Sequence, residues 1–288
     1  MIAAIWTVVI GTHAQDPLEV EGVEIPISVP LVPHKRHIPV VEVMVEGQGP
    51  YRFGLDTCAS GEGRINTAIA EALQCQKVGT VNAQDGTGVG GERAVLYRID
   101  NLKVGGALFR GARLYAREGN RMSIDEYDRL DGILGFGLFK KLLLTLDFTH
   151  RRVQISRGRL SEGGGAVSMD LSHGIAQAHV QIADQDELCD IDSGNNGGLT
   201  LPLDLAQKLP LGAPLKKIGT ALTYYNKFNI YGSTLKGEIQ VGGQVMRNPS
   251  FSTADSFKRA NVGFDVLKYY TVTFDQADGL LKLSRPGR

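Results

Sequence analysis

The hydrophobic positions of this chain come in short runs that glycine- and proline-containing turns separate. Three of the runs are residues 40–45, 51–55 and 94–99, which are rich in β-branched and aromatic side chains and therefore predict short β-strands. Only residues 67–73 and 203–209 show the spacing of one or two helical turns. The pattern predicts a mostly β protein with a few short helices.

Three blocks of the sequence occur twice and in the same order. The block pairs are residues 53–57 and 189–193, residues 102–110 and 239–247, and residues 133–147 and 261–275, at offsets of 136, 137 and 128 residues. Collinear blocks indicate an internal duplication, so we expect two homologous lobes. We place lobe 1 at residues 36–158, a glycine-rich linker at 159–168 and lobe 2 at 169–286.

Composition and charge agree with this organisation. The chain has 288 residues, enough for two compact lobes, and its 36 glycines and 11 prolines suit many tight turns. The formal net charge is zero and the charges are interspersed, so we expect no nucleic-acid partner. The histidines and the three cysteines have no metal-ligand spacing, so we expect no metal and no cofactor.

The first residues are apolar and are followed by small residues. Residues 1–10 with the stretch that follows resemble a secretory signal peptide, although a positive start is missing and a buried first strand is the other interpretation. We expect a signal peptide at residues 1–14, an N-terminal segment at 15–35, and a periplasmic or secreted protein. No later segment has the roughly 20 apolar residues of a membrane helix, so we expect no integral membrane segment in the mature chain.

Each copy of the repeat contains a hydrophobic strand that ends in aspartate and a small hydroxyl residue. The two motifs are Leu55-Asp56-Thr57-Cys58-Ala59-Ser60 and Ile191-Asp192-Ser193-Gly194-Asn195-Asn196. Two carboxyl groups related by a pseudo-twofold axis can meet between the lobes. Like charges at contact distance do not both ionise easily, so such a pair shares a proton and provides both an acid and a base.

These motifs resemble those of the retropepsin-like and pepsin-like aspartic peptidase superfamily. Its pattern is a hydrophobic residue, Asp-Thr/Ser-Gly-x-Ser/Thr, and downstream two hydrophobic residues and glycine, which Ile133-Leu134-Gly135 matches. The resemblance extends over nearly all of the chain after residue 36, and residues 144–148 resemble bacterial aspartyl proteases in particular. It implies an all-β fold of two acid-protease-type β-barrel lobes in one chain, arranged about a pseudo-twofold axis and acting as a monomer.

The resemblance also implies roles for individual residues. Asp56 and Asp192 would activate a water for hydrolysis of a peptide bond in a peptide or protein substrate, as in an aspartic endopeptidase. The hydroxyls of Thr57 and Ser193 would bond across the lobe interface and position the carboxyl groups. The substrate-covering flap of lobe 1 would have its turn at Gly88 and Gly90, and its counterpart in lobe 2 would lie near Tyr224 and Tyr225.

The chain departs from the pattern at three positions. Cys58 replaces the glycine of the first motif, Asn196 replaces the supporting hydroxyl of the second, and Asn261 makes the second downstream element polar at its first position. Ser60 and Gly194 keep the expected residue types. The departures leave open a second interpretation, a catalytically weak or inactive peptide-binding protein that keeps the aspartic protease fold.

Overall fold

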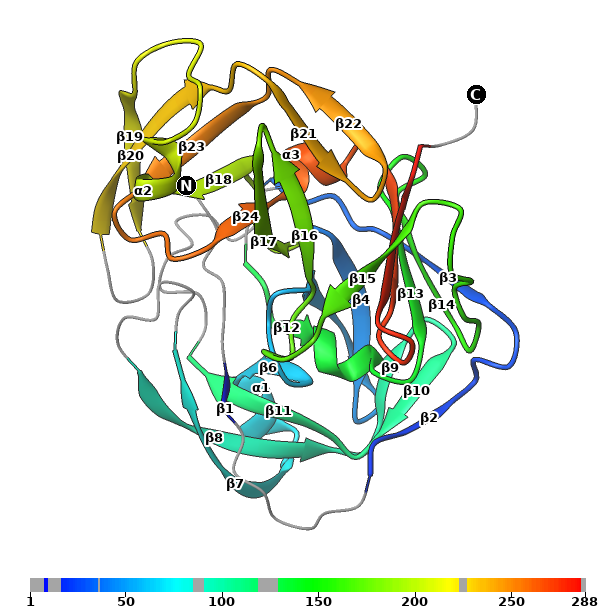
Figure 1. Ribbon diagram of the computed structural model, residues 1–288. Coiled ribbons are helices and arrows are strands. Elements are labelled where there is room, and N and C mark those ends of the chain that lie inside the picture. Colours follow the sequence, from blue (N-terminus) through cyan, green and yellow to red (C-terminus); the bar gives the residue numbers. More distant parts are fainter. Residues whose placement is uncertain are drawn as a thin grey trace.

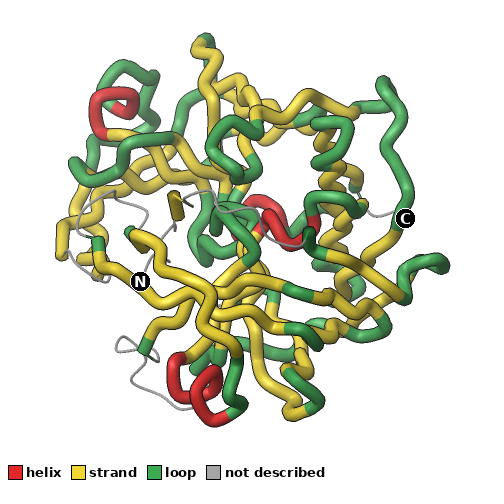
Figure 2. Tube along the Cα trace, turned by 90° about the horizontal axis from the view of Figure 1, so that it is seen from below, coloured by secondary structure: helices red, strands yellow, loops and turns green. Residues whose placement is uncertain are grey.

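The protein is all-β and has two lobes, as the sequence predicted. The computed structural model describes residues 8–9, 17–35, 37–84, 91–118, 129–222 and 227–285. Strands dominate both views, and helices are few and short (Figures 1 and 2). In Figure 1 the first lobe lies at the bottom, the second at the top, and a sheet to which both halves of the chain contribute lies at the right.

The first lobe is built on an eleven-stranded sheet with the order β1-β7-β8-β11-β6-β12-β5-β4-β9-β10-β2. Its elements are β1 (Val8–Val9), β2 (Glu19–Glu21), β4 (Val40–Val45), β5 (Gln48–Asp56), β6 (Gly63–Asn66), α1 (Thr67–Ala72), β7 (Gln76–Ala83), β8 (Glu92–Ile99), β9 (Leu102–Val104), β10 (Ala107–Arg110), β11 (Ala112–Arg117), β12 (Gly132–Gly135) and the 3-10 helix η2 (Phe136–Phe139). The predicted strands at 40–45, 51–55 and 94–99 are β4 and parts of β5 and β8.

The second lobe repeats this arrangement with its own strands. Its elements are β15 (Ala166–Asp170), β16 (Gln177–Ile182), β17 (Gln185–Ile191), β18 (Leu199–Pro202), α2 (Leu203–Ala206), β19 (Lys216–Leu222), β20 (Lys227–Thr234), β21 (Glu238–Val241), β22 (Gln244–Arg247), β23 (Ser250–Ala254), β24 (Ala260–Val262) and α3 (Phe264–Leu267). Helix α2 is shorter than the predicted residues 203–209, since a turn precedes Pro210 and the residue before a proline disfavours helical backbone.

A base sheet joins the two halves of the chain. Its order is β15-β26-β25-β13-β14-β3, with β3 at Ile27–Pro30, β13 at Leu143–Asp147, β14 at Arg152–Ser156, β25 at Thr271–Asp275 and β26 at Leu280–Ser284. Strands β13 and β25 pair antiparallel at its centre, with Thr145 opposite Thr273 and their hydroxyl oxygens 3.0 Å apart. These two residues align at the 128-residue offset, so the pairing relates equivalent positions of the two halves by a local twofold axis.

The same strand arrangement positions the ends of β5 and β17. In the first lobe β12 lies between β5, to which it is parallel, and β6, to which it is antiparallel. In the second lobe β24 lies in the same way between β17 and β18. Asp56 is the last residue of β5 and Asp192 directly follows β17, so both aspartates sit at equivalent ends of equivalent strands.

The N-terminal run lies almost entirely outside the described residues. Only Val8 and Val9 of residues 1–16 are described, and they pair with β7. Among the helices that the structure describes, none combines the length and the apolar character that crossing a bilayer requires.

Candidate active site

The side chains of Asp56 and Asp192 meet between the lobes. Both are buried, with exposed fractions of 4% and 1%, and the Asp192 side chain hydrogen-bonds to Asp56. Gly194 lies against the same carboxyl group, because a Cβ atom on Gly194 would come within 2.4 Å of Asp56 Cγ. Only a glycine at position 194 therefore leaves room for the Asp56 carboxyl group where it stands.

Thr57 and Ser193 tie the two aspartate loops together by four reciprocal hydrogen bonds. The Thr57 hydroxyl donates to Ile191 O at 2.6 Å and accepts from Ser193 N at 3.0 Å. The Ser193 hydroxyl donates to Leu55 O at 2.8 Å and accepts from Thr57 N at 3.1 Å. All the groups involved are buried, so these bonds fix each loop relative to the other, and with the loops they fix the two carboxyl groups.

The Asp56 carboxyl group has a pKa raised to about 6. Burial is the largest cause, because it disfavours the charged form. The backbone N–H groups of Cys58 and Ala59, the Asp192 side chain and the Arg64 charge lower the pKa and oppose part of the effect. The Cys58 N–H donates to Asp56 Oδ1 at 2.8 Å.

The Asp192 carboxyl group has its pKa raised further, well above its usual value. Burial again contributes most, followed by the negative charge of Asp56, and hydrogen bonds from Asn261 and Gly194 oppose the rise. Oδ1 accepts from the N–H groups of Gly194 at 2.8 Å and Asn195 at 3.1 Å. The two carboxyl groups are therefore suited to sharing a single proton, and the stronger rise of the Asp192 pKa favours that residue as its holder.

Two buried asparagines hold the other oxygen of Asp192. Asn261 Nδ2 donates to Asp192 Oδ2 at 2.7 Å, and Asn195 Nδ2 donates to Asn261 Oδ1 at 2.7 Å. The Gly197 N–H completes the chain by donating to Asn195 Oδ1 at 2.8 Å. Both carboxyl oxygens of Asp192 thus accept hydrogen bonds, which fixes the orientation of the group.

One comparison with known proteins identifies the first of these loops. Residues 41–138, which are 98 of the 288 residues and include Asp56 and Ile133-Leu134-Gly135, match the family model described as aspartyl protease. This part of the chain belongs to the aspartic protease superfamily. Among curated proteins, none matches the chain.

The aspartic protease motif of this chain keeps its geometry despite Cys58. The Cys58 side chain is fully buried, with Sγ 3.6 Å from Ile191 O and 3.9 Å from Ala176 O, so it points into the lobe interface. Burial and then the Asp192 charge raise the pKa of the thiol well above its usual value, which keeps the thiol protonated. Ser60, in the same loop, is buried as well.

The donor that supports Asp192 differs from the residue that the motif indicated. Asn196 stands where the family pattern has the supporting hydroxyl, but the carboxamide that reaches Asp192 is that of Asn261, and Asn196 Oδ1 is buried without a hydrogen-bond partner among the described residues. The sequence did contain a signal. Asn261 is a polar residue at a hydrophobic position of the protease pattern, and a buried amide needs a partner.

A third carboxylate near Asp56 and Asp192 was not predicted. Asp190 is buried and accepts from Gln177 Nε2 at 2.7 Å and from Arg259 Nε at 3.0 Å. Its charge adds to the rise of the Asp192 pKa. The signal in the sequence was the spacing Asp190-Ile191-Asp192, because alternate residues of a strand point to the same face.

The four residues expected in the flaps, Gly88, Gly90, Tyr224 and Tyr225, lie outside the described residues. The hairpins that lead to them are described. Ala83 pairs with Glu92 at the end of β7–β8, and Leu222 pairs with Lys227 at the end of β19–β20. In both hairpins the strand register shifts at a Lys-x-Gly sequence, at residues 77–79 and 217–219. The two hairpins therefore correspond to each other in sequence as well as in position.

The described residues contain no group of three or more histidine, cysteine, aspartate or glutamate side chains arranged to hold a metal ion. The arrangement around Asp56 and Asp192 supports acid–base chemistry by two carboxyl groups of different pKa.

Proposed function

We propose that the protein is an aspartic endopeptidase that hydrolyses peptide bonds with a water activated between Asp56 and Asp192. The observation that carries this proposal is the contact of two buried carboxyl groups whose pKa values are raised to different extents. A pair of titratable groups with separated pKa values assigns the acid and the base. Membership of the first lobe in the aspartic protease superfamily agrees with this function.

The order of the two pKa values assigns the roles in the reaction. Asp56, the ionised partner, takes a proton from the water as its oxygen bonds to the carbonyl carbon of the scissile amide. Asp192 gives its proton to the carbonyl oxygen, which yields a tetrahedral diol. When the C–N bond breaks, Asp56 passes its proton to the departing nitrogen and Asp192 recovers one from a diol hydroxyl. The pair then holds one proton again.

The neighbours of the pair position these groups. The bonds of Thr57 and Ser193 hold the two loops at a fixed separation, and Asn261 fixes the orientation of the Asp192 carboxyl group. Because their atoms bond to backbone or to a carboxylate, these residues act through the two aspartates. They are positioning residues.

The test is peptide cleavage by single variants of each aspartate. Asp56→Asn and Asp192→Asn should each lower kcat by at least about 1,000-fold, since either change removes the acid or the base, while the fold is kept. Cleavage of a peptide library is followed by mass spectrometry, with circular dichroism as the check of folding. Asp204→Asn, on the exposed first turn of α2, is the matched control and should cleave like the wild type.

Turnover close to that of the wild type by either active-site variant would refute the proposal. A wild-type protein that binds peptides, or a statine-type inhibitor, but cleaves no member of the library would refute it as well, and would favour a peptide-binding protein.

A further inference from the structure

A second buried carboxylate lies beside Asp192, on the same face of β17. Asp190 has an exposed fraction of 1%, and its two oxygens accept from Arg259 Nε at 3.0 and 3.2 Å. Burial raises the pKa of Asp190, and the Arg259 charge opposes the rise and favours the ionised form. Residues two apart in a strand point to the same face, so the Asp190 side chain lies roughly 7 Å from that of Asp192.

The contacts of the two carboxylates follow the same step along the parallel strands β17 and β24. Arg259 directly precedes β24 and donates to Asp190. Asn261, two residues later, donates to Asp192, two residues after Asp190. Because parallel strands keep their register, the same step on both strands gives the same geometry. The ion pair of Asp190 thus stands directly before the Asn261 contact of Asp192.

The first lobe has other residue types at the corresponding positions. Asp190 corresponds to Gly54 at the offset of 136 residues, and Arg259 corresponds to Asp131 at the offset of 128. The Asp131 carboxylate accepts from the Arg52 backbone N–H at 2.8 Å. Glycine has no side chain that could pair, so these positions place no ion pair beside Asp56. The pair of Asp190 and Arg259 therefore distinguishes the surroundings of Asp192 from those of Asp56.

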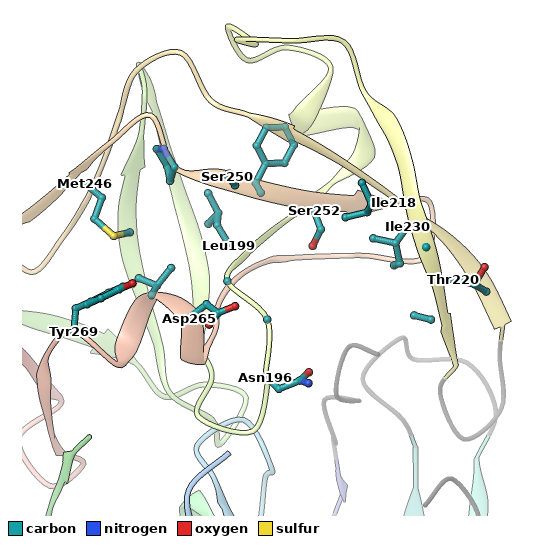
Figure 3. A pocket seen from close by; sticks show the side chains of 17 residues that line it. Asn196, Leu199, Ile218, Thr220, Ile230, Met246, Ser250, Ser252, Asp265 and Tyr269 are labelled. Atoms are coloured by element: carbon teal, nitrogen blue, oxygen red, sulfur yellow. The ribbon is translucent and has the colours of Figure 1, made fainter. Parts of the chain in front are cut away.

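On one side, the loop after Asp192 borders open space. A pocket of about 680 Å³ lies between this loop, the hairpin β19–β20, strand β23 and helix α3, and small residues are part of its lining: Gly197, Gly198, Ser250 and Ser252. Figure 3 shows Asn196 of this loop at the lower end of the pocket. The pocket leaves that side of the loop without close packing, so the contacts between β17 and β24 contribute more to the position of Asp192.

Other titratable side chains also act on the two aspartates of the candidate site or on Asp190 from the elements around them: Asp56, Cys58, Arg64, His173 and Cys189. The two thiols are buried, which raises their pKa and keeps them protonated. The histidine is exposed, and its Nδ1 lies 2.9 Å from Oε1 of Gln177, whose Nε2 donates to Asp190. Neither the thiols nor the histidine therefore replaces the Asp190 charge beside Asp192.

We propose that Asp190 and Arg259 are positioning residues for Asp192. Their ion pair holds the end of β17 against β24, and the Asp190 charge keeps the shared proton on Asp192 rather than on Asp56, because a neighbouring like charge disfavours ionisation. Asp192 is thereby kept as the acid and Asp56 as the base. This inference rests on the proposed endopeptidase function and names residues that regulate the same site.

Asp190→Asn tests the role of the charge. The variant keeps the shape of the side chain, and its carboxamide oxygen still accepts from Gln177 and Arg259. Loss of the negative charge eases ionisation of Asp192, so the alkaline limb of the kcat/KM profile should move to lower pH by roughly 1 pH unit. The acid limb, which Asp56 sets, should move less. Lower stability with an unmoved alkaline limb would show a merely structural role and overturn the proposal.

Asp186→Asn is the matched control on the same strand. The Asp186 side chain is 51% exposed and pairs with His179, six positions before Asp192 along the chain. At the strand rise this separation is roughly 20 Å, so solvent screens the charge from Asp192. Both limbs of the profile should therefore stay where the wild type has them. A shift as large as that of Asp190→Asn would overturn the assignment to Asp190.

Variants of Arg259 test the ion pair itself. Arg259→Gln leaves the Asp190 carboxylate buried without its cation, so the midpoint of urea unfolding should fall. The double variant Asp190→Asn/Arg259→Gln should have a midpoint closer to that of the wild type, because neither charge is left alone. Arg259→Lys should restore most of the midpoint and the wild-type pH profile. A loss in the double variant equal to the sum of the single losses would overturn the pairing.

Failure of this proposal can be told from failure of the proposed function. If wild type cleaves peptides and Asp190→Asn leaves the alkaline limb in place, the positioning pair is overturned and the function stands. If wild type cleaves nothing, the proposed function fails, and a carboxyl NMR titration tests the pair, with the Asp192 signal assigned by its loss in Asp192→Asn. A lower titration midpoint of this signal in Asp190→Asn would support the pair, and an equal midpoint would overturn it.

Discussion

At the scale of single residues, the two aspartates of the candidate site differ although their motifs are alike. Asp56 accepts hydrogen bonds from backbone N–H groups and interacts with the Arg64 charge. Asp192 also interacts with the charge of Asp190 and accepts a hydrogen bond from the Asn261 carboxamide. Asp190 and Asn261 stand where the first lobe has Gly54 and Ile133, neither of which carries a polar side chain. The surroundings of the two aspartates thus differ through these two substitutions in the second copy and through the Arg64 charge in the first.

The pKa order leads to a prediction about pH. Catalysis needs Asp56 ionised and Asp192 protonated, and Asp56 has a pKa of about 6. As pH falls through that value Asp56 gains a proton and the base is lost, so kcat/KM should fall about 10-fold per pH unit below it. Measurement of kcat/KM from pH 4 to 9 should show the highest rates at neutral to weakly alkaline pH. An optimum near pH 3 to 4 would contradict this assignment.

Asn261→Leu provides a matched variant for the same measurement. The Asn261 hydrogen bond lowers the pKa of Asp192, so its loss raises that pKa and moves the alkaline limb of the profile to higher pH. The acid limb, which Asp56 sets, should stay in place. Equal movement of both limbs would show that Asn261 acts on the whole site rather than on Asp192.

The residue scale is also where sequence reasoning reached its limit. The motifs alone identified Asp56, Asp192, Thr57 and Ser193, because each motif is local and occurs twice. The contact of Asn261 with Asp192 joins residues 69 positions apart, and the strand pairing of β17 with β24 creates it. The sequence around one strand does not show which distant strand will pair with it, so the motif pointed to the nearby Asn196 as the residue beside Asp192.

At the scale of secondary-structure elements, the reciprocal bonds of Thr57 and Ser193 connect the ends of β5 and β17. Each hydroxyl donates to the strand end of the opposite lobe and accepts from the opposite loop. The sequence predicted this connection through the resemblance to aspartic peptidases. It did not predict the pocket between β19–β20, β23 and α3, since small residues indicate space only when their positions in neighbouring strands are known.

Removal of one hydroxyl should weaken both the fold and the site. Thr57→Val keeps the side-chain shape but leaves Ile191 O and Ser193 N without their buried partner, which should lower the free energy of unfolding by about 1–3 kcal/mol. Urea unfolding gives this value, and kcat should fall because the carboxyl groups lose their fixed separation. The double variant Thr57→Val/Ser193→Ala should cost less than the sum of the single changes, since the four bonds act together. Strict additivity would show that the two hydroxyls act independently.

At the scale of the whole molecule, one chain supplies both aspartates. The two lobes meet through the base sheet, in which β13 and β25 pair along five residues each, and Phe136 packs edge-on against Phe274 at 5.6 Å between ring centres. Each half of the chain contributes one of the two buried carboxyl groups of the candidate site. The duplication inferred from the sequence predicted this division, because equivalent motifs in equivalent lobes place one aspartate in each.

A site completed within one chain should not depend on protein concentration. Activity per molecule should stay constant over a 100-fold dilution, because no association of chains is needed. Initial rates at fixed substrate, measured from micromolar to nanomolar protein, provide the check, with light scattering to report the mass. Activity per molecule that falls on dilution would indicate that a second chain completes or stabilises the site.

The long sequence separation between the partners of the Thr57 and Ser193 hydrogen bonds has a consequence for biosynthesis. The four bonds between the aspartate loops join residues 134 to 138 positions apart, and the base sheet that supports them contains β25 and β26 near the end of the chain. While the ribosome is still making the second half, Asp56 has no partner and the nascent chain has no completed pair of carboxyl groups. The proposed proteolytic activity therefore arises only after both lobes have been synthesised and have folded together, so it cannot act on the same chain while the second lobe is still unfinished.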